Sequence, residues 1–113
     1  MTANAIAETL RTIEQKGAMT GADVAEVLDI RRETVSRWNQ GKSAPQRDTE
    51  RVLLELAYIV RQLSDIYQPQ QARLWLFSRQ KLLHDKRPAE LIRSGKIEHV
   101  LAVVNRLRDD VYL

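Results

Sequence analysis

The stretch TGADVAEVLDIRRETVSRWNQG, residues 20–41, decides how the first half of this chain folds. Thr20 can cap a helix together with Asp23, and the apolar residues that follow predict a short helix over residues 21–28. Val35 and Trp38, three residues apart, predict a second helix over residues 32–40. Because only three residues separate the two helices, the stretch predicts a helix-turn-helix.

One face of this predicted unit is basic and polar. We expect Ala25 to let the helices approach, while Ile30, Val35 and Trp38 hold the second helix from beneath. The opposite face carries arginine and hydroxyl groups, which suit guanine edges and phosphate oxygens. Glu33 can accept from cytosine or pair with Arg37. The predicted DNA-binding residues are Arg31, Arg32, Thr34, Ser36, Arg37 and Lys42.

This basic face also has a plainer interpretation, in which the unit is a scaffold and its arginines are solvated. The motif favours contact with operator DNA over this alternative. One copy reads too few base pairs for tight specific binding, so DNA recognition implies a homodimer or a larger assembly. The long helix predicted over residues 48–66 could join two copies, although its apolar stripe fits core packing better.

Helical periodicity continues on both sides of the motif. The flanking helices are predicted over residues 5–16, 48–66, 69–77, 88–94 and 97–108. We expect Gly17 to cap the first of these, and Asp48 or Thr49 to cap the long one. No hairpin signal or repeat occurs, so the fold class is all-α with seven helices.

The chain divides at the end of its long helix. Residues 1–66 are predicted to form the helix-turn-helix unit with its connecting helix, and residues 67–113 a second small helical unit. In that unit Trp75, Leu76 and Phe77 are too densely apolar for a solvated surface. We expect them to pack in a core, although one of them can still reach an interface.

Composition argues against several classes of function. The chain has no cysteine, and His84 and His99 lie too far apart to be helical metal ligands. Its four glycines all fall at predicted helix ends, so no glycine loop can cradle a phosphate. We therefore expect no enzymatic activity, no cofactor and no metal site. No apolar run approaches the roughly 18 residues that span a bilayer and no signal peptide is recognisable, which predicts a cytoplasmic protein without a membrane partner.

Positive charge is concentrated in two places. Residues 1–66 hold 9 Lys and Arg against 10 Asp and Glu, whereas residues 67–113 hold 9 against 5. Within the first half, five basic residues lie between positions 31 and 47, opposed there by Glu33 alone. The charge pattern therefore indicates an anionic partner for the helix-turn-helix and a basic surface on the second half.

The two halves resemble parts of one known family. Residues 27–45 resemble the second and third helices of Xre and phage-repressor-like proteins. The second half resembles the toxin-binding domain of the Xre/MbcA/ParS antitoxin family at Trp75, Leu82, Pro88, Leu91, Gly95, Val100 and Leu107. This chain departs from the family pattern at two places. Ser78 and Arg79 stand after the tryptophan where the family often has a Pro-Asn pair. The last helix opens at Lys96 without another glycine.

The resemblance implies a partner and a mechanism. The partner would be a RES-domain toxin that degrades NAD, bound in a hetero-oligomer and inhibited by occlusion of the cleft that NAD enters. The helix-turn-helix could also repress the chain's own operon. The predicted toxin-binding residues are Arg79, Lys81, Arg93, Lys96, Arg108, Tyr112 and Leu113.

Two other interpretations stay open at this point. Taken singly, each of Arg79, Lys81, Arg93 and Lys96 is better explained as solvated surface, whereas as a group they are the best candidate rim for a partner. A stand-alone helix-turn-helix regulator is the alternative to an antitoxin, and it would bind DNA alone in a salt-sensitive manner.

Overall fold

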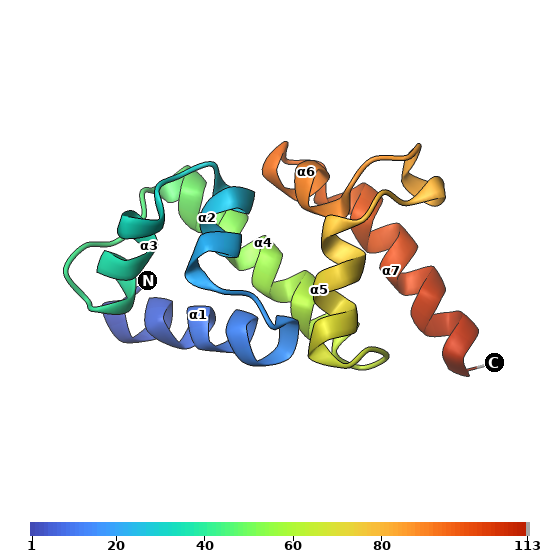
Figure 1. Cartoon of the computed structure of the whole chain (residues 1–113), viewed down its shortest axis with the longest axis horizontal. Helices are drawn as coiled ribbons and strands as arrows, with labels where there is room; N and C mark the ends of the chain where they lie inside the picture. Colours follow the sequence, from blue (N-terminus) through green and yellow to red (C-terminus); the bar gives the residue numbers. More distant parts are fainter. Residues whose placement is uncertain (113) are drawn as a thin grey trace.

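A computed structural model describes residues 1–112, and the side chains of residues 1–111, as an all-helical protein (Figure 1). The helices are α1 (Ala3–Gly17), α2 (Gly21–Leu28), α3 (Arg32–Asn39), α4 (Arg47–Leu63), α5 (Pro69–Phe77), the 3-10 helix η1 (Lys81–Leu83), α6 (Pro88–Arg93) and α7 (Ile97–Tyr112). The described residues contain one isolated β-bridge, between Gln80 and Lys86, and no strand. The predicted all-α class and the seven α-helices are confirmed.

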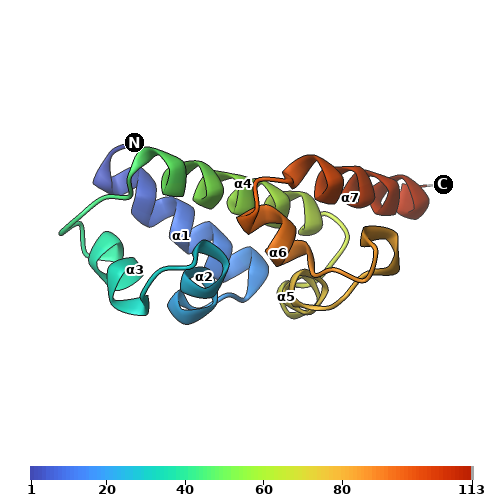
Figure 2. The same cartoon turned by 90° about the horizontal axis from the view of Figure 1, so that it is seen from above.

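Helix α4 is the central element of an elongated molecule. The helices α1, α2 and α3 lie at one end of it and α5, α6 and α7 at the other (Figure 2). Helix α4 packs against α1, α2, α6 and α7. The principal extents are 45 × 23 × 20 Å. The chain therefore presents two separate ends, one formed by the helix-turn-helix and one by its second half.

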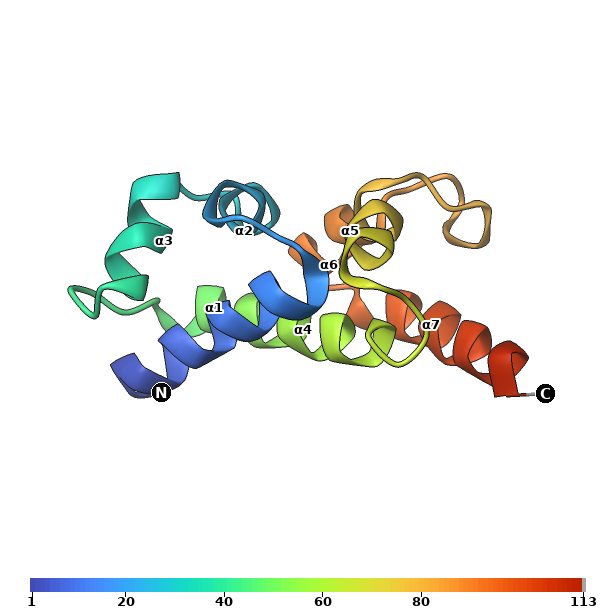
Figure 3. The ribbon, with the colours of Figure 1, turned by 60° about the horizontal axis from the view of Figure 1, so that its bottom comes forward.

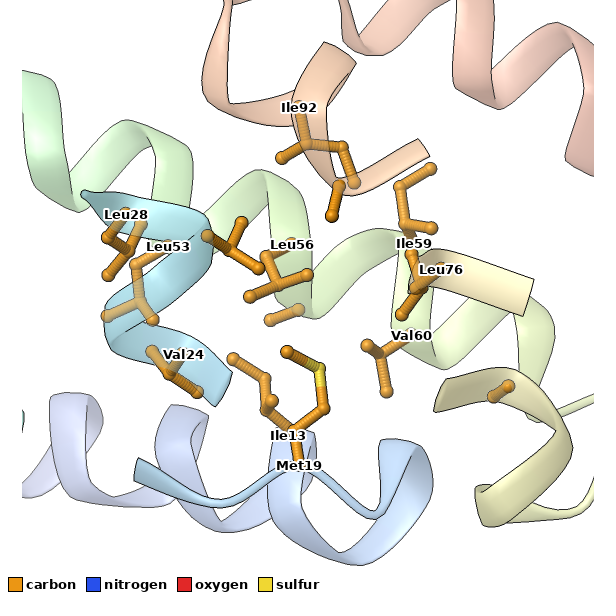
Figure 4. Packing of buried hydrophobic residues seen from close by; sticks show 14 of the residues in the cluster. Ile13, Met19, Val24, Leu28, Leu53, Leu56, Ile59, Val60, Leu76 and Ile92 are labelled. Atoms are coloured by element: carbon orange, nitrogen blue, oxygen red, sulfur yellow. The ribbon is translucent and has the colours of Figure 1, made fainter. Parts of the chain in front are cut away.

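The core runs through both ends without a break. In α4, Leu53, Leu56, Ile59, Val60 and Leu63 are fully buried. Side chains from the first half and from the second half pack around them (Figure 4). Burial of each such side chain contributes about 1.5–3 kcal/mol. The stripe of α4 is core, as the sequence favoured, and the boundary predicted at residue 66 is crossed by continuous packing.

Local signals placed α2 and α3 accurately. Thr20 Oγ1 accepts from the Asp23 amide at 3.2 Å, and the Asp23 carboxylate accepts from the Thr20 amide at 3.0 Å. This capping box begins α2 where the sequence predicted it. Asp29 takes the left-handed conformation with φ 56°, which turns the chain toward α3.

Several helix ends differ from the sequence prediction, among them the end of α4, which lies at Leu63 and not at residue 66. Gly17 is helical, and Ala18 takes the left-handed cap position with φ 49°. A Cβ on Gly17 would lie 3.1 Å from Val60, so this glycine serves a close approach of α1 to α4. Helix α4 begins at Arg47 after Gln46. Helix α7 continues four residues past the predicted end, because elongation adds a hydrogen bond per residue even without core contacts.

Candidate functional site

The recognition helix α3 exposes one polar face. Val35 and Trp38 are buried beneath it, and the Ile30 amide donates to the Ala25 carbonyl at 3.0 Å to fix the turn. Arg32 and the other predicted contact residues on this helix are exposed on the opposite side, except for one. That exception is Thr34, which is half-buried at the border of the exposed face.

The guanidinium groups of this face are not neutralised within the chain. Among the described residues, no ion pair involves Arg31, Arg32, Arg37 or Lys42. Glu33 does not pair with Arg37, one of the two roles that the sequence left open for it. Unpaired, exposed arginines on a helix-turn-helix can contact phosphate oxygens and guanine edges. The geometry is therefore compatible with DNA binding.

The predicted partner-binding residues separate into two groups. Arg79, Lys81 and Lys96 are exposed on the second half of the chain. Arg79 borders a hollow of about 420 Å³ between α5 and the following loop. Lys96 borders a hollow of about 430 Å³ between η1 and α7. These three residues lie where a partner could reach them.

The other two described arginines of the set are held by contacts within the chain. Arg93 donates from Nε to the Val27 carbonyl at 3.2 Å and from Nη2 to the Glu26 carbonyl. These carbonyls belong to the last turn of α2, where the Glu26 carbonyl also accepts from the Asp29 amide, so Arg93 caps α2 from α6. Sequence reasoning missed this role.

Arg108 links α7 of the second half to the end of α4 in the first half. Its Nη2 lies 2.8 Å from the Asp65 carboxylate, and its Nη1 donates to Gln62 Oε1. The contacts join α7 to the end of α4, so Arg108 has a structural role besides any contact with a partner. The side chain of Tyr112 and the whole of Leu113 lie outside the described residues.

A buried carboxylate connects the helix-turn-helix to the second half. Arg73 of α5 donates from Nε and Nη2 to Asp23 at 3.0 and 2.9 Å, and its guanidinium lies 5.3 Å from the ring centroid of Phe77. The hydrogen bonds from Arg73 lower the pKa of Asp23 against the raising effect of burial. The pair raises the pKa of Arg73 in turn. No sequence spacing could have found this contact, since fifty residues separate its partners.

Large apolar side chains are exposed on the second half. Leu74 of α5, Leu82 of η1 and Val111 of α7 are each more than half exposed. The sequence assigned Leu82 to the family pattern but gave no sign of its exposure. The described residues contain no cluster of His, Cys, Asp and Glu able to hold a metal ion. None of the described helices has both the length and the apolar character needed to cross a membrane.

Known proteins resemble this chain over its whole length. No family model matches it. It is 32% identical over 113 residues to the mycobacterial cidal antitoxin MbcA of Mycobacterium tuberculosis and to that of Mycobacterium bovis, covering all of both proteins in each case. A probable mycobacterial cidal antitoxin of M. tuberculosis is 30% identical over 95 residues, which cover 84% of this chain and 81% of that protein.

The fold agrees with a solved structure. A chain in the crystal structure of the M. tuberculosis MbcT–MbcA toxin–antitoxin complex superposes with a TM-score of 0.83 and 32% sequence identity. The superposition covers 96% of this chain and 97% of that chain. The similarity therefore includes both ends of the molecule and the central helix that joins them.

Proposed function

The chain belongs to the family of the mycobacterial cidal antitoxin MbcA, and on that premise we propose that it neutralises a RES-domain, NAD-degrading toxin. The family makes it an antitoxin of a toxin–antitoxin system. The proposal adds the class of the toxin and the way in which it is inhibited.

The observation that carries this proposal is the full-length match to a chain from a toxin–antitoxin complex. That match includes the second half, where the exposed basic residues Arg79, Lys81 and Lys96 and the exposed apolar side chains lie. Interfaces commonly combine a desolvated apolar centre with a polar rim. We propose that residues 67–113 provide this interface and residues 1–66 the DNA-binding unit.

Occlusion of the toxin cleft is the proposed mode of inhibition. The last turns of α7 reach the far end of the molecule, away from the helices of the first half (Figure 3). A helix end that projects from a rigid body can fill a cleft without any catalytic group of its own. In this proposal Arg108 holds α7 to α4 through Asp65, so that the helix end approaches the toxin in a fixed direction.

Repression of its own operon is the second part of the proposal. The unpaired arginines of α3 favour it, because neutralised phosphates supply much of the affinity for DNA. Specific recognition would need two copies. Leu54 and Tyr58 on the outer face of α4 are exposed and could join two copies in a homodimer.

Capture of the partner tests the proposal. The tagged chain is purified from its native host, the co-purified protein is identified by mass, and its gene is expressed alone and together with this chain. We expect arrested growth in the first case and normal growth in the second. Salt-sensitive promoter binding without any toxic partner would instead favour a stand-alone regulator.

A further inference from the structure

A groove of about 430 Å³ separates η1 from the first turns of α7. Apolar side chains line it, namely Leu82, Leu83, Leu91, Ala102 and Val103. Leu83 is buried, whereas its neighbour Leu82 is 54% exposed at the edge of the groove. We call this feature the Leu82 groove.

The loop that carries Leu82 is held in a fixed shape. The Gln80 amide donates to the Lys86 carbonyl at 3.1 Å, and the Asp85 amide donates to the Gln80 carbonyl at 2.9 Å. Arg79 Nη1 donates to the Asp85 carbonyl at 3.3 Å. The exposed leucine is therefore presented by an ordered loop, which reduces the entropy lost when a partner binds.

The turn of this loop uses left-handed backbone. His84 and Asp85 both have positive φ, at 58° and 61°, and the Lys86 amide donates to the Leu83 carbonyl at 3.1 Å, as in a type I′ turn. Histidine and aspartate are among the residues with a side chain that enter this region most often. Within the chain, the result is a leucine held in solvent, which by itself does not favour folding.

The rim of the groove is basic. Lys86, Lys96 and Glu98 line it, together with His84 and His99. From position 79 to position 96 the chain has six Lys and Arg and two Asp, Glu residues. A segment that enters the groove therefore meets an apolar floor and a positive rim.

We propose that the Leu82 groove receives a segment of the toxin in which a large apolar side chain is flanked by carboxylates. The inference rests on the proposed function and specifies a contact through which this chain binds the toxin. The apolar side chain covers Leu82, and the carboxylates face Lys86 and Lys96. A two-fold contact between two copies of the groove would oppose these lysines to one another, which disfavours a symmetric self-contact.

The test measures affinity for the purified toxin captured from the host. Leu82→Ala should weaken binding at least about tenfold, because truncation of a central apolar anchor commonly costs that much. Its thermal unfolding should be unchanged, since the side chain is half in solvent. Leu54→Ala, on the outer face of α4, is the matched control and should bind as the wild type does.

Charge reversal provides an independent test. Lys86→Glu combined with Lys96→Glu should slow association and weaken binding, whereas Lys16→Glu on α1 should not. A photoreactive benzoylphenylalanine at position 82 should crosslink to a toxin peptide that contains Asp or Glu. This crosslink keeps the inference testable if a loop variant folds poorly.

The outcomes separate the two proposals. If the wild-type chain binds no toxin, the proposed function fails. If the wild type binds but Leu82→Ala and the double charge reversal bind equally well, and position 82 gives no crosslink, the groove inference is wrong while the antitoxin function stands. It is also wrong if the crosslink joins two copies of the chain, for instance to the Asp109–Asp110 end of another α7.

Discussion

The ion pair between Asp23 and Arg73 should couple the two ends of the molecule energetically. We would replace Asp23→Asn, Arg73→Gln and both together, and measure the free energy of unfolding of all four proteins. The atoms lie 2.9 and 3.0 Å apart, with 12% of the Asp23 side chain and 45% of the Arg73 side chain exposed. The double-mutant cycle isolates the free energy of this one contact.

The expected coupling follows from partial burial. Exposed ion pairs contribute about 0.2–1 kcal/mol, and buried hydrogen bonds to charged groups about 1.5–3 kcal/mol. Because solvent screens the half-exposed Arg73, we expect a coupling of about 1 kcal/mol, near the top of the first range. Asparagine keeps an acceptor for the Thr20 amide, so Asp23→Asn alone should cost only about 1–2 kcal/mol.

Acid should remove this contribution. Arg73 lowers the pKa of Asp23 below its ordinary value of 3.8. The stabilisation is therefore fully present above pH 3.8 and is lost as the pH falls through the pKa of the folded state. Wild type and Asp23→Asn should differ at pH 7 and converge on acidification below that value.

Urea unfolding followed by circular dichroism checks both expectations. The assay is run at pH 7 and near the acid limit of folding for all four proteins. A coupling below about 0.3 kcal/mol would refute the reasoning, since that is the error of additivity for independent sites. So would a stability difference between wild type and Asp23→Asn that does not shrink with acid.

Three further predictions address the core, the recognition helix and the C-terminal end. Leu56→Ala should destabilise the chain by about 2–5 kcal/mol in urea unfolding because the side chain is fully buried, whereas exposed Tyr58→Ala should cost under about 1 kcal/mol. Replacing Arg32 and Arg37 together by alanine should weaken operator binding and flatten its salt dependence with helicity unchanged; lost helicity would mean that the exposed face is misassigned. Deleting residues 109–113 should reduce neutralisation in a growth assay more than it lowers the melting temperature, and full protection would remove this segment from the mechanism.

Local chemistry explains what the sequence predicted well. The reciprocal bonds of Thr20 and Asp23 begin α2, and Pro69 and Pro88 each occupy the first turn of a helix. These signals act within four residues, so no tertiary information is needed to interpret them. The burial of Val35 and Trp38 follows from helical periodicity in the same way.

Contacts between distant segments explain what it missed. Arg93 looked like a rim residue because nothing near it in sequence pairs with it, yet it caps α2 across 66 residues. Arg108 is likewise held by Asp65. The predicted cap at Gly17 was wrong, because the cap position is taken by Ala18. Gly17 is the last residue of α1, where its lack of a side chain lets the helix pack against Val60. Such roles depend on which helix faces meet, and helical periodicity alone does not specify this.

The sequence also did not predict the exposure of Leu82. Its neighbour Leu83 is buried, and two adjacent leucines in sequence carry no sign of which one faces the core. The two left-handed residues that follow are His84 and Asp85, and neither is glycine. A fold prediction from periodicity has no access to a loop of this kind.

The most direct test of the central claim is a titration of toxin activity. The purified partner is freed of this chain, its consumption of NAD is recorded, and the chain is added back in increasing amounts. We predict that NAD consumption falls to background as the complex forms, and that deletion of residues 109–113 weakens the effect. A complex that forms while NAD consumption continues unchanged, or a partner that consumes no NAD, would contradict the proposed inhibition of an NAD-degrading toxin.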